Sequence, residues 1–388
     1  MRGPARLLAF IALAGGALAA PPPVLAGGPA RANGVPAALG LPAMEVPADN
    51  PVTPAKVALG RKLFVDRRLS PNGTMSCAMC HVPEQGFTAH ELATSVGIEG
   101  RSVRRNAPTV LNVAWQRRLF HDGREVSLED QVWGPLLAVN EMGNPSIGYV
   151  LERIAALPDY RGLFEAAFAG RGPSSARVGA ALASYQRTLV AADSRFDRWR
   201  YGGDTSALNA VEKAGFELFT GKGRCAACHS IGTRDALFTD HAFHNTGVGW
   251  RRTFGMPERT RVELAPGVHA ELDRRTVESF SEPPAKDVGR YEITLDPKDR
   301  WAYKTPSLRN VALTAPYMHD GSLRTLESVV EFYDRGGVDN PDRSALVAPL
   351  GLTPTERAAL VAFLRTLTGR SVDALAADAR GAATAAGR

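Results

Sequence analysis

The sequence CAMCH at residues 77–81 recurs as CAACH at residues 225–229, and these two segments contain all four cysteines of the chain. Both read C-x-x-C-H, the attachment sequence for a c-type haem. Two thiols at this spacing reach the two vinyl groups on one porphyrin edge, and the histidine that follows supplies its imidazole to the iron. A thioredoxin-like redox pair or two disulfides are the alternatives, but two copies that use every cysteine favour two haems. The predicted attachment residues are Cys77, Cys80, Cys225 and Cys228, and the predicted iron ligands are His81 and His229.

The residues that precede each motif also repeat. ALGRKLFVD at residues 58–66 comes before the first motif, and KAGFELFTG at residues 213–221 comes before the second. A helix followed by the motif therefore occurs twice, which predicts two cytochrome c-like domains in a mostly α fold. The matching pairs are Gly60 with Gly215, Leu63 with Leu218, and Phe64 with Phe219.

Each predicted domain needs a further helix to close it. Residues 176–199 supply one candidate and residues 353–367 the other, with Thr353 as N-cap and Pro354 at the first helical position. The predicted division is a signal peptide at 1–26, an N-terminal peroxidatic haem domain at 27–203, a C-terminal electron-transfer haem domain at 204–370 and a flexible low-complexity tail at 371–388.

Composition indicates a globular, exported protein. The chain has 388 residues, 44% of them hydrophobic, and a net charge of +6. Arg2 and Arg6 precede an apolar run at residues 7–20 that is too short for a membrane span, a pattern typical of a secretory signal peptide. Basic residues alternate with acidic ones, as in DSRFDRWR at 193–200, which argues against a nucleic-acid partner. We expect a periplasmic protein with no membrane span.

Three segments between and after the motifs resemble the family of bacterial dihaem cytochrome c peroxidases and MauG-like proteins. They are RNAPTVLNVAWQRRLFHDGRE at 105–125, GPLLAVNEMGN at 134–144 and TPSLRNVALTAPYMHDGSLRTLE at 305–327. The resemblance extends from about residue 54 to residue 369. It implies an enzyme with two covalently bound c-type haems that acts on hydrogen peroxide.

In this family the N-terminal haem, here on His81, meets peroxide in a pocket that holds a glutamine, a proline and a glutamate. Gln131, Pro135 and Glu141 stand at the matching places in LEDQVWGPLLAVNEMGN. Cleavage of a bound peroxide needs a base that takes a proton from one oxygen and returns it to the leaving oxygen, and a carboxylate can do both. The alternative for Glu141 is a surface or capping glutamate.

The resemblance also implies a calcium ion between the domains. Its protein ligands in the family are an asparagine side chain and two backbone carbonyls, which Asn106, Thr314 and Pro316 match. Such oxygen donors suit calcium. The alternative is that Asn106 only caps a turn.

One apolar face of the helix predicted around residues 326–333 ends in Tyr333. Without further context this is a core tyrosine with a hydrogen-bonded hydroxyl. In ordinary peroxidases of the family, the second haem takes a methionine as sixth ligand at this position, whereas MauG-like proteins have tyrosine. The resemblance therefore implies that Tyr333 ligates the iron opposite His229, with Met318 and Met256 as rivals.

Two departures from the ordinary peroxidases bear on function. Ile98 stands where those enzymes have a distal histidine that blocks the resting first haem, so we expect an open site; the nearest histidine is His90. His121 stands where relatives have a tryptophan between the haems, which makes it an interhaem relay candidate but a poor one, or a hydrogen-bonded core histidine or haem-propionate partner. Trp115 and Trp133 lie near it in sequence. The remaining histidines are interpreted as structural or supporting (His319, His241, His244) or solvated (His269).

The leading hypothesis is a periplasmic dihaem oxidoreductase that uses peroxide to form a high-valent first haem and then oxidises an electron donor or a protein substrate, as MauG-like enzymes do. A phenolate ligand favours ferric iron and lowers the potential, which makes the second haem a poor acceptor. The first alternative is an ordinary peroxidase that takes electrons from a small cytochrome c or a cupredoxin. The second alternative is a dihaem electron carrier.

Overall fold

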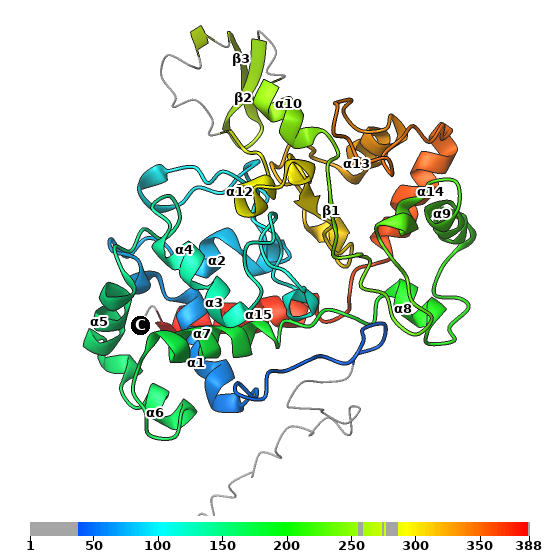
Figure 1. Cartoon of the computed structure of the whole chain (residues 1–388). Helices are drawn as coiled ribbons and strands as arrows, with labels where there is room; N and C mark the ends of the chain where they lie inside the picture. The colour runs from blue at the N-terminus through cyan, green and yellow to red at the C-terminus, as the bar shows by residue number, and fades with distance from the viewer. Residues whose placement is uncertain (1–37, 255–258, 274, 277–285, 387–388) are drawn as a thin grey trace, which may run out of the picture.

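A computed structural model describes residues 38–254, 259–273, 275–276 and 286–386. The described chain is mostly α-helical and forms two cytochrome c-like halves, as predicted (Figure 1). Its strands make two antiparallel ribbons: β1 (Phe243–His244) pairs with β4 (Tyr303–Lys304), and β2 (Arg259–Ala265) pairs with β3 (Val268–Asp273).

The first half is built on two crossing helices, α1 (Pro54–Val65) and α7 (Ser175–Gln186). They approach so closely at Gly60 that a Cβ there would lie 1.9 Å from the carbonyl oxygen of Ala181. Only glycine allows this distance. The crossing organises a continuous apolar core that includes Leu59, Leu63, Phe64, Leu182 and Tyr185.

The second half repeats this crossing with α9 (Ala210–Thr220) and α14 (Pro354–Arg365). A Cβ on Gly215 would lie 2.0 Å from the carbonyl oxygen of Ala359. The two glycines that match in sequence therefore have the same structural role: each allows the two helices of its half to cross closely. The second core includes Phe196, Phe219, Phe238, Leu360 and Phe363.

Short helices connect these frames. In the first half they are η1 (Arg67–Leu69), α2 (Cys77–Cys80), η2 (Pro83–Gln85), η3 (Ile98–Gly100), η4 (Val113–Trp115), α3 (Leu128–Gln131), α4 (Trp133–Leu137), α5 (Ile147–Ala156), η5 (Pro158–Tyr160) and α6 (Leu163–Ala167). In the rest of the chain they are α8 (Arg195–Arg200), η6 (Cys225–Ala227), α10 (Val248–Phe254), α12 (Tyr291–Thr294), η7 (Pro297–Asp299), η8 (Val311–Leu313) and α13 (Leu326–Asp334). The longer helix α15 (Val372–Ala386) follows α14.

The single helix predicted at residues 176–199 is wrong. The chain leaves α7 after Gln186 and starts α8 afresh, because Ser194 and Asp197 form a capping box that begins a new helix. Phe196 of α8 packs in the second core. The chain thus passes from the first core to the second between α7 and α8, before the boundary predicted between residues 203 and 204.

The prediction of a flexible tail is also wrong for most of residues 371–388. Val372–Ala386 form helix α15, which lies along α1 with Ala379 fully buried and Asp378 paired with Arg61. The alanine-rich composition that suggested low complexity also gives high helix propensity. The last helix of the chain therefore covers the first half (Figure 1).

The first described residues make the opposite crossing. The segment after residue 38 reaches the second half, where the carbonyl oxygen of Gly40 accepts a hydrogen bond from the backbone N–H of Ala236 at 3.0 Å. Gly40 also packs against the buried ion pair of Asp197 and Arg309, in which Oδ2 of Asp197 and Nη1 of Arg309 are 2.9 Å apart. Each end of the described chain therefore secures the half that it does not belong to.

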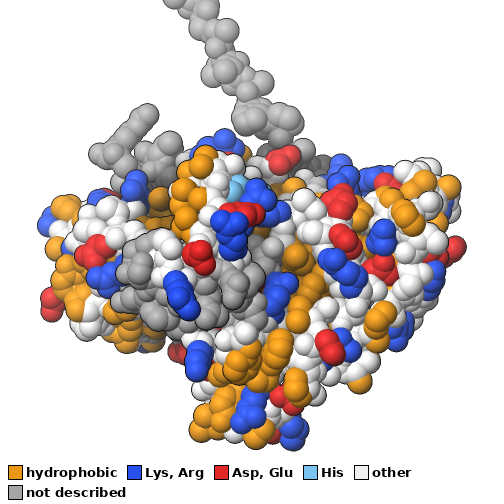
Figure 2. Space-filling view, turned by 90° about the horizontal axis from the view of Figure 1, so that it is seen from above, with side chains coloured by type: hydrophobic (Ala, Val, Ile, Leu, Met, Phe, Trp, Pro, Cys, Tyr) orange, Lys and Arg blue, Asp and Glu red, His pale blue; other side chains and the backbone are white. Residues whose placement is uncertain are grey.

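Among the helices in the described ranges, none is long and apolar enough to cross a membrane. The predicted signal peptide lies outside the described residues. On the face shown in Figure 2, basic, acidic and apolar side chains are interspersed, which fits the mixed-charge surface expected from the sequence.

Candidate active site

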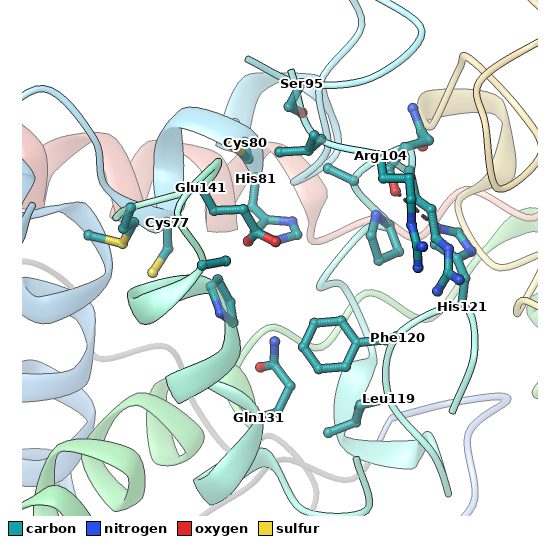
Figure 3. Close-up of a pocket in the computed structure, with 18 of the residues that line it drawn as sticks. Cys77, Cys80, His81, Ser95, Arg104, Leu119, Phe120, His121, Gln131 and Glu141 are labelled. Atoms are coloured by element: carbon teal, nitrogen blue, oxygen red, sulfur yellow. Dashed lines mark hydrogen bonds between the residues drawn. The ribbon is translucent and has the colours of Figure 1, made fainter. Parts of the chain in front are cut away.

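A cavity of about 1400 Å³ lies at the first motif (Figure 3). Its walls bring together residues that are far apart in sequence: the motif, the end of α3 and the loop after α4. Every residue predicted for the first haem and its peroxide pocket lines this cavity, namely Cys77, Cys80, His81, Gln131, Pro135 and Glu141.

His81 is oriented by its backbone surroundings. Its Nδ1 lies 3.3 Å from the carbonyl oxygen of Phe87, a residue in the left-handed region at φ 57°. A hydrogen bond from Nδ1–H to this carbonyl leaves the lone pair of Nε2 for a metal. Burial lowers the pKa of His81, so the neutral, ligating form is favoured.

Glu141 faces the same cavity from the loop that follows α4 (Figure 3). Burial raises the pKa of its carboxyl group, and nearby Arg124 acts in the opposite direction. Its backbone carbonyl accepts a hydrogen bond from the N–H of Ile98 at 2.8 Å, which fixes the loop. A buried carboxyl group of raised pKa can hold and release a proton at this wall.

Neither Ile98, which replaces the blocking histidine, nor His90, the nearest histidine in the sequence, lines the first cavity. Ile98 is buried and packs against Gly143 behind the Glu141 loop. His90 has its Nε2 2.7 Å from the carbonyl oxygen of Leu313. The geometry is therefore consistent with the expectation of an open first site.

A second cavity of about 340 Å³ lies at the second motif and is lined by Cys225, Cys228 and His229. Nδ1 of His229 lies 2.9 Å from the carbonyl oxygen of Phe238, which also has a left-handed backbone at φ 53°. Each cavity thus presents two thiols and one backbone-oriented imidazole, the set of groups that a c-type haem needs. The residues present fit two covalently attached haems.

The apolar face of α13 lines this second cavity. Its members are Leu326, Val329, Val330 and Tyr333, so the face that ends in a phenol is a cavity wall. Burial raises the pKa of the Tyr333 phenol. The ligand role of Tyr333 stays a prediction. Of its rivals, Met318 also lines the cavity, and Met256 lies outside the described residues.

His121 lies between the two cavities and lines both, as does Phe120. Its Nε2 is 2.9 Å from the carbonyl oxygen of Asn106, and burial lowers its pKa to about 4. It is therefore a neutral, hydrogen-bonded imidazole at the position expected for a relay, and the relay role stays a prediction. Trp115 and Trp133 line neither cavity.

The predicted calcium residues Asn106, Thr314 and Pro316 all lie around the second cavity. The Asn106 side chain is buried, and its amide donates a hydrogen bond to the carbonyl oxygen of Ala93 at 3.0 Å. Calcium binding by these residues stays a prediction.

The structure reveals a longer internal repeat that the sequence analysis missed. The same interval along the chain separates Asn112 from Asn310 and Phe120 from Met318, and each pair has left-handed backbone, at φ 56° and 62° and at φ 63° and 72°. Two short identities, NVA and HDG, occur once in each copy and could have revealed it. By the same interval, His121 corresponds to His319.

The two copies meet through reciprocal backbone hydrogen bonds. The N–H of Asn106 donates to the carbonyl oxygen of His319 at 2.7 Å, and the N–H of Lys304 donates to that of His121 at 2.8 Å. Asn106 and Lys304 are separated by the interval of the repeat. The contact between the halves is therefore an approximate twofold arrangement.

The repeat also relates the walls opposite the two histidines. Ser127 caps α3 and Thr325 caps α13 at corresponding positions, each accepting a hydrogen bond from a backbone N–H of the first turn. In this register Pro135 corresponds to Tyr333, and each lines its own cavity. A proline side chain cannot ligate iron, whereas a phenol can.

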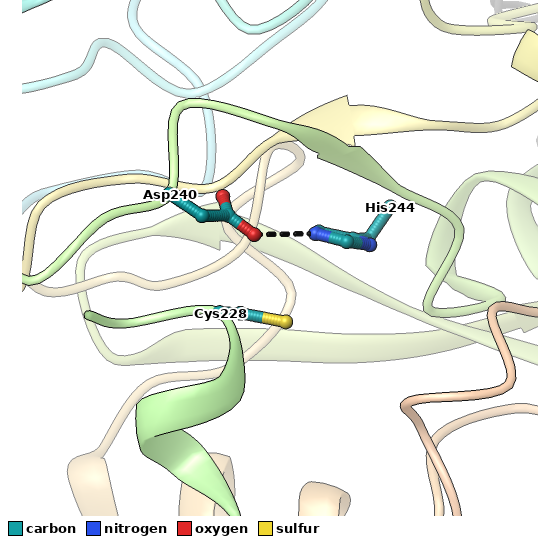
Figure 4. Close-up of side chains that lie close together, drawn as sticks. All are labelled: Cys228, Asp240 and His244. Carbon is teal, nitrogen blue, oxygen red and sulfur yellow. Dashed lines mark hydrogen bonds and ion pairs between the residues drawn. The ribbon is translucent and has the colours of Figure 1, made fainter.

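Cys228, Asp240 and His244 place possible metal-ligating atoms within 4.8 Å of one another (Figure 4). His244 Nε2 lies 2.8 Å from Asp240 Oδ2. Because Cys228 belongs to the second haem motif, its sulfur would form a thioether when a haem is attached there. The cluster is thus part of the haem site, with Asp240 and His244 as a hydrogen-bonded pair beside it.

Comparisons with known proteins agree with this geometry. Residues 54–206 match the family model of di-haem cytochrome c peroxidase, and residues 212–368 match that of cytochrome c. Methylamine utilization protein MauG of Methylorubrum extorquens is 43% identical over 322 residues, which cover 83% of this chain and 80% of that protein. Cytochrome-c peroxidase IdrP1 of Denitromonas iodatirespirans is 38% identical over 333 residues, covering 84% and 85%.

Solved structures show the same similarity. A MauG-like protein associated with microbial copper homeostasis superimposes with a TM-score of 0.70 at 34% identity, covering 86% of this chain and 95% of that one. The diheme peroxidase BthA from Burkholderia thailandensis gives a TM-score of 0.62 at 25% identity, covering 83% and 87%.

Proposed function

Because the chain belongs to the dihaem cytochrome c peroxidase family and is a dihaem peroxidase-type oxidoreductase, we propose that it works as the MauG-like members do. It is a periplasmic enzyme that uses hydrogen peroxide to oxidise a protein substrate or electron donor. The observation that carries this proposal is the position of Tyr333 on the wall of the second cavity, which His229 also lines.

In the first cavity the role of the protein is proton transfer. The haem, when bound through Cys77, Cys80 and His81, supplies the redox chemistry that reduces peroxide to water. Glu141 accepts a proton from one peroxide oxygen and returns it to the leaving oxygen. Gln131 and Pro135 shape the wall beside it.

In the second cavity the protein would determine which oxidation state of the haem iron is favoured. With a haem held by Cys225, Cys228 and His229, the phenol of Tyr333 would serve as an iron ligand, and ligation would remove its proton. An anionic oxygen ligand favours ferric iron and lowers the potential. A haem held in this way would accept electrons poorly from a small cytochrome, which favours oxidation of another molecule.

Two further roles complete the proposal. His121, which lines both cavities, is the relay candidate between the haems, and its neutral imidazole makes it a weaker relay than an indole. Asn106, with the backbone carbonyls of Thr314 and Pro316, binds a calcium ion that holds the halves together.

The second candidate is an ordinary cytochrome c peroxidase that receives electrons from a small cytochrome c or a cupredoxin. Met318 favours it, because this residue also lines the second cavity and offers a thioether ligand. Thioether ligation raises the potential and makes the haem a ready acceptor.

The test is peroxide consumption by the purified dihaem protein supplied with a reduced small cytochrome c. The MauG-like proposal predicts little oxidation of the donor but an optical change when peroxide meets the fully ferric protein. Rapid donor oxidation would establish the ordinary peroxidase instead. Glu141→Gln is the control, because it should suppress the peroxide reaction in either case.

A further inference from the structure

Lys304 is a lysine in the wall of the second cavity. It ends strand β4, where it pairs with Phe243, and its backbone N–H bonds to His121. Its Nζ donates a hydrogen bond to the side-chain oxygen of Gln116 at 2.7 Å. Gln116 lines the same cavity. The amine is therefore held in a defined place.

Lys304 is half-buried, and the hydrogen-bond partner of its amine is the uncharged side chain of Gln116. Burial is the one contribution that shifts the pKa of Lys304, and it lowers the pKa to about 8. Lys56 provides a contrast: burial lowers its pKa too, but Asp49 and Glu129 act in the opposite direction. A buried ammonium without a carboxylate costs free energy unless a bound anion compensates it.

The other basic side chains of this cavity differ from Lys304. Arg309 forms a buried ion pair with Asp197 at 2.9 Å. Arg118 and Arg224 are exposed to solvent. Among the lysine and arginine residues that line the cavity, Lys304 is thus the half-buried one whose described hydrogen-bond partner is uncharged.

The chemistry of the cavity identifies the missing anion. Cys225 and Cys228 attach a haem here, and a haem carries two propionate carboxylates. The repeat adds a second indication, because Lys304 occupies the place that Asn106 occupies in the other copy. Where one copy offers an amide, the other offers an ammonium.

We propose that Lys304, positioned by Gln116, binds a carboxylate of the second haem and so raises the reduction potential of that haem. A fixed positive charge near the iron disfavours the more positive ferric state. The inference rests on haem attachment at Cys225 and Cys228 and is independent of the proposed peroxide chemistry.

The test is a spectroelectrochemical titration of both haems, without peroxide, in the holoprotein and in Lys304→Met. We expect the midpoint potential of the second haem to fall while that of the first haem stays unchanged. Lys304→Arg should retain the original potential because it keeps the charge. Lys298→Met removes a lysine that is 86% exposed and should change neither potential.

Two results would overturn the proposal: an unchanged potential of the second haem in Lys304→Met, or equal shifts at both haems, which would indicate a general structural effect. If Lys304→Met does not fold, Lys304→Gln carries the same test, because it keeps a polar side chain of similar length without the charge. The same selective fall is expected there, and its absence would again reject the proposal.

Discussion

The two cavities are built alike on one side and differently on the other. On the motif side each has paired cysteines and a histidine oriented by a carbonyl from a left-handed phenylalanine, Phe87 or Phe238. On the opposite side Pro135 in the first cavity corresponds to Tyr333 in the second. The two cavities therefore share the haem-binding side and differ at the corresponding position on the facing wall.

The difference has a simple physical basis. A proline contributes no ligand and no N–H donor, so the helix breaks between α3 and α4 and the loop that follows brings Glu141 to the cavity. Without such a break, α13 continues as one helix through Tyr333. We infer that one site is kept accessible for a proton-transferring carboxyl group while the other is closed by a phenol.

Glu141→Gln gives the largest expected effect and tests whether the first cavity alone carries the peroxide chemistry. Loss of the proton-transfer group should slow the reaction of the ferric protein with peroxide by about 10²–10⁴-fold. Stopped-flow absorbance measures this rate. Glu331→Gln, at an exposed position on α13, should react like the unchanged protein. Equal rates for Glu141→Gln and the unchanged protein would mean that another group moves the proton.

Deletion of α15 tests an asymmetry, because this helix covers the first half only. A chain that ends at Arg370 should lose about 2–4 kcal/mol of unfolding free energy, since Val372, Ala376 and Ala379 are buried. Denaturant titration followed at the Soret band measures the loss. A chain that ends at Arg380 keeps these contacts and should lose much less. If the chain that ends at Arg370 is as stable as the chain that ends at Arg380, the buried residues of α15 contribute nothing to the unfolding free energy.

Gly60→Ala and Gly215→Ala test whether the two helix crossings are equivalent. Each added Cβ would lie 1.9 Å or 2.0 Å from a backbone carbonyl oxygen, so each variant should lose about 1–3 kcal/mol. Gly148→Ala in α5 is the control, because the nearest atom to its Cβ is 3.7 Å away. Thermal unfolding of the three variants makes the comparison. A large loss in only one crossing variant would show that the halves are not equivalent.

The smallest expected effect is a pH dependence of stability. Burial raises the pKa of Glu141 in the folded protein, so the folded state holds this proton better than the unfolded chain. Stability due to this group is therefore lost as pH rises from its unfolded pKa through the higher folded pKa. Glu141→Gln should be more stable than the unchanged protein at neutral pH, and the gain should shrink in acid. A gain that does not vary with pH would contradict the assignment.

Local patterns in the sequence predicted local structure well. The attachment motifs, the paired glycines and the capping box at Thr353 and Glu356 depend on neighbours along the chain, and the structure has the expected helices and crossings at these places. The family resemblance then predicted that Gln131, Pro135 and Glu141 share one pocket, and the structure has all three in the wall of one cavity.

What failed depended on contacts between distant segments. The packing of α15 on α1 and of Phe196 in the second core cannot be derived from periodicity, because either segment could bury the same residues elsewhere. The role of Lys304 was missed for the same reason. A lysine in YKTPS reads as a surface residue until the cavity around it is known.

The proposed function requires that Tyr333 ligates the second iron while the first site stays open. Low-temperature EPR of the fully ferric protein and of Tyr333→Phe tests it most directly. We expect the signal of the second haem to change in the variant and that of the first haem to stay the same. Identical spectra for both proteins would show that another residue, such as Met318, holds the second iron, and would remove the basis for a MauG-like function.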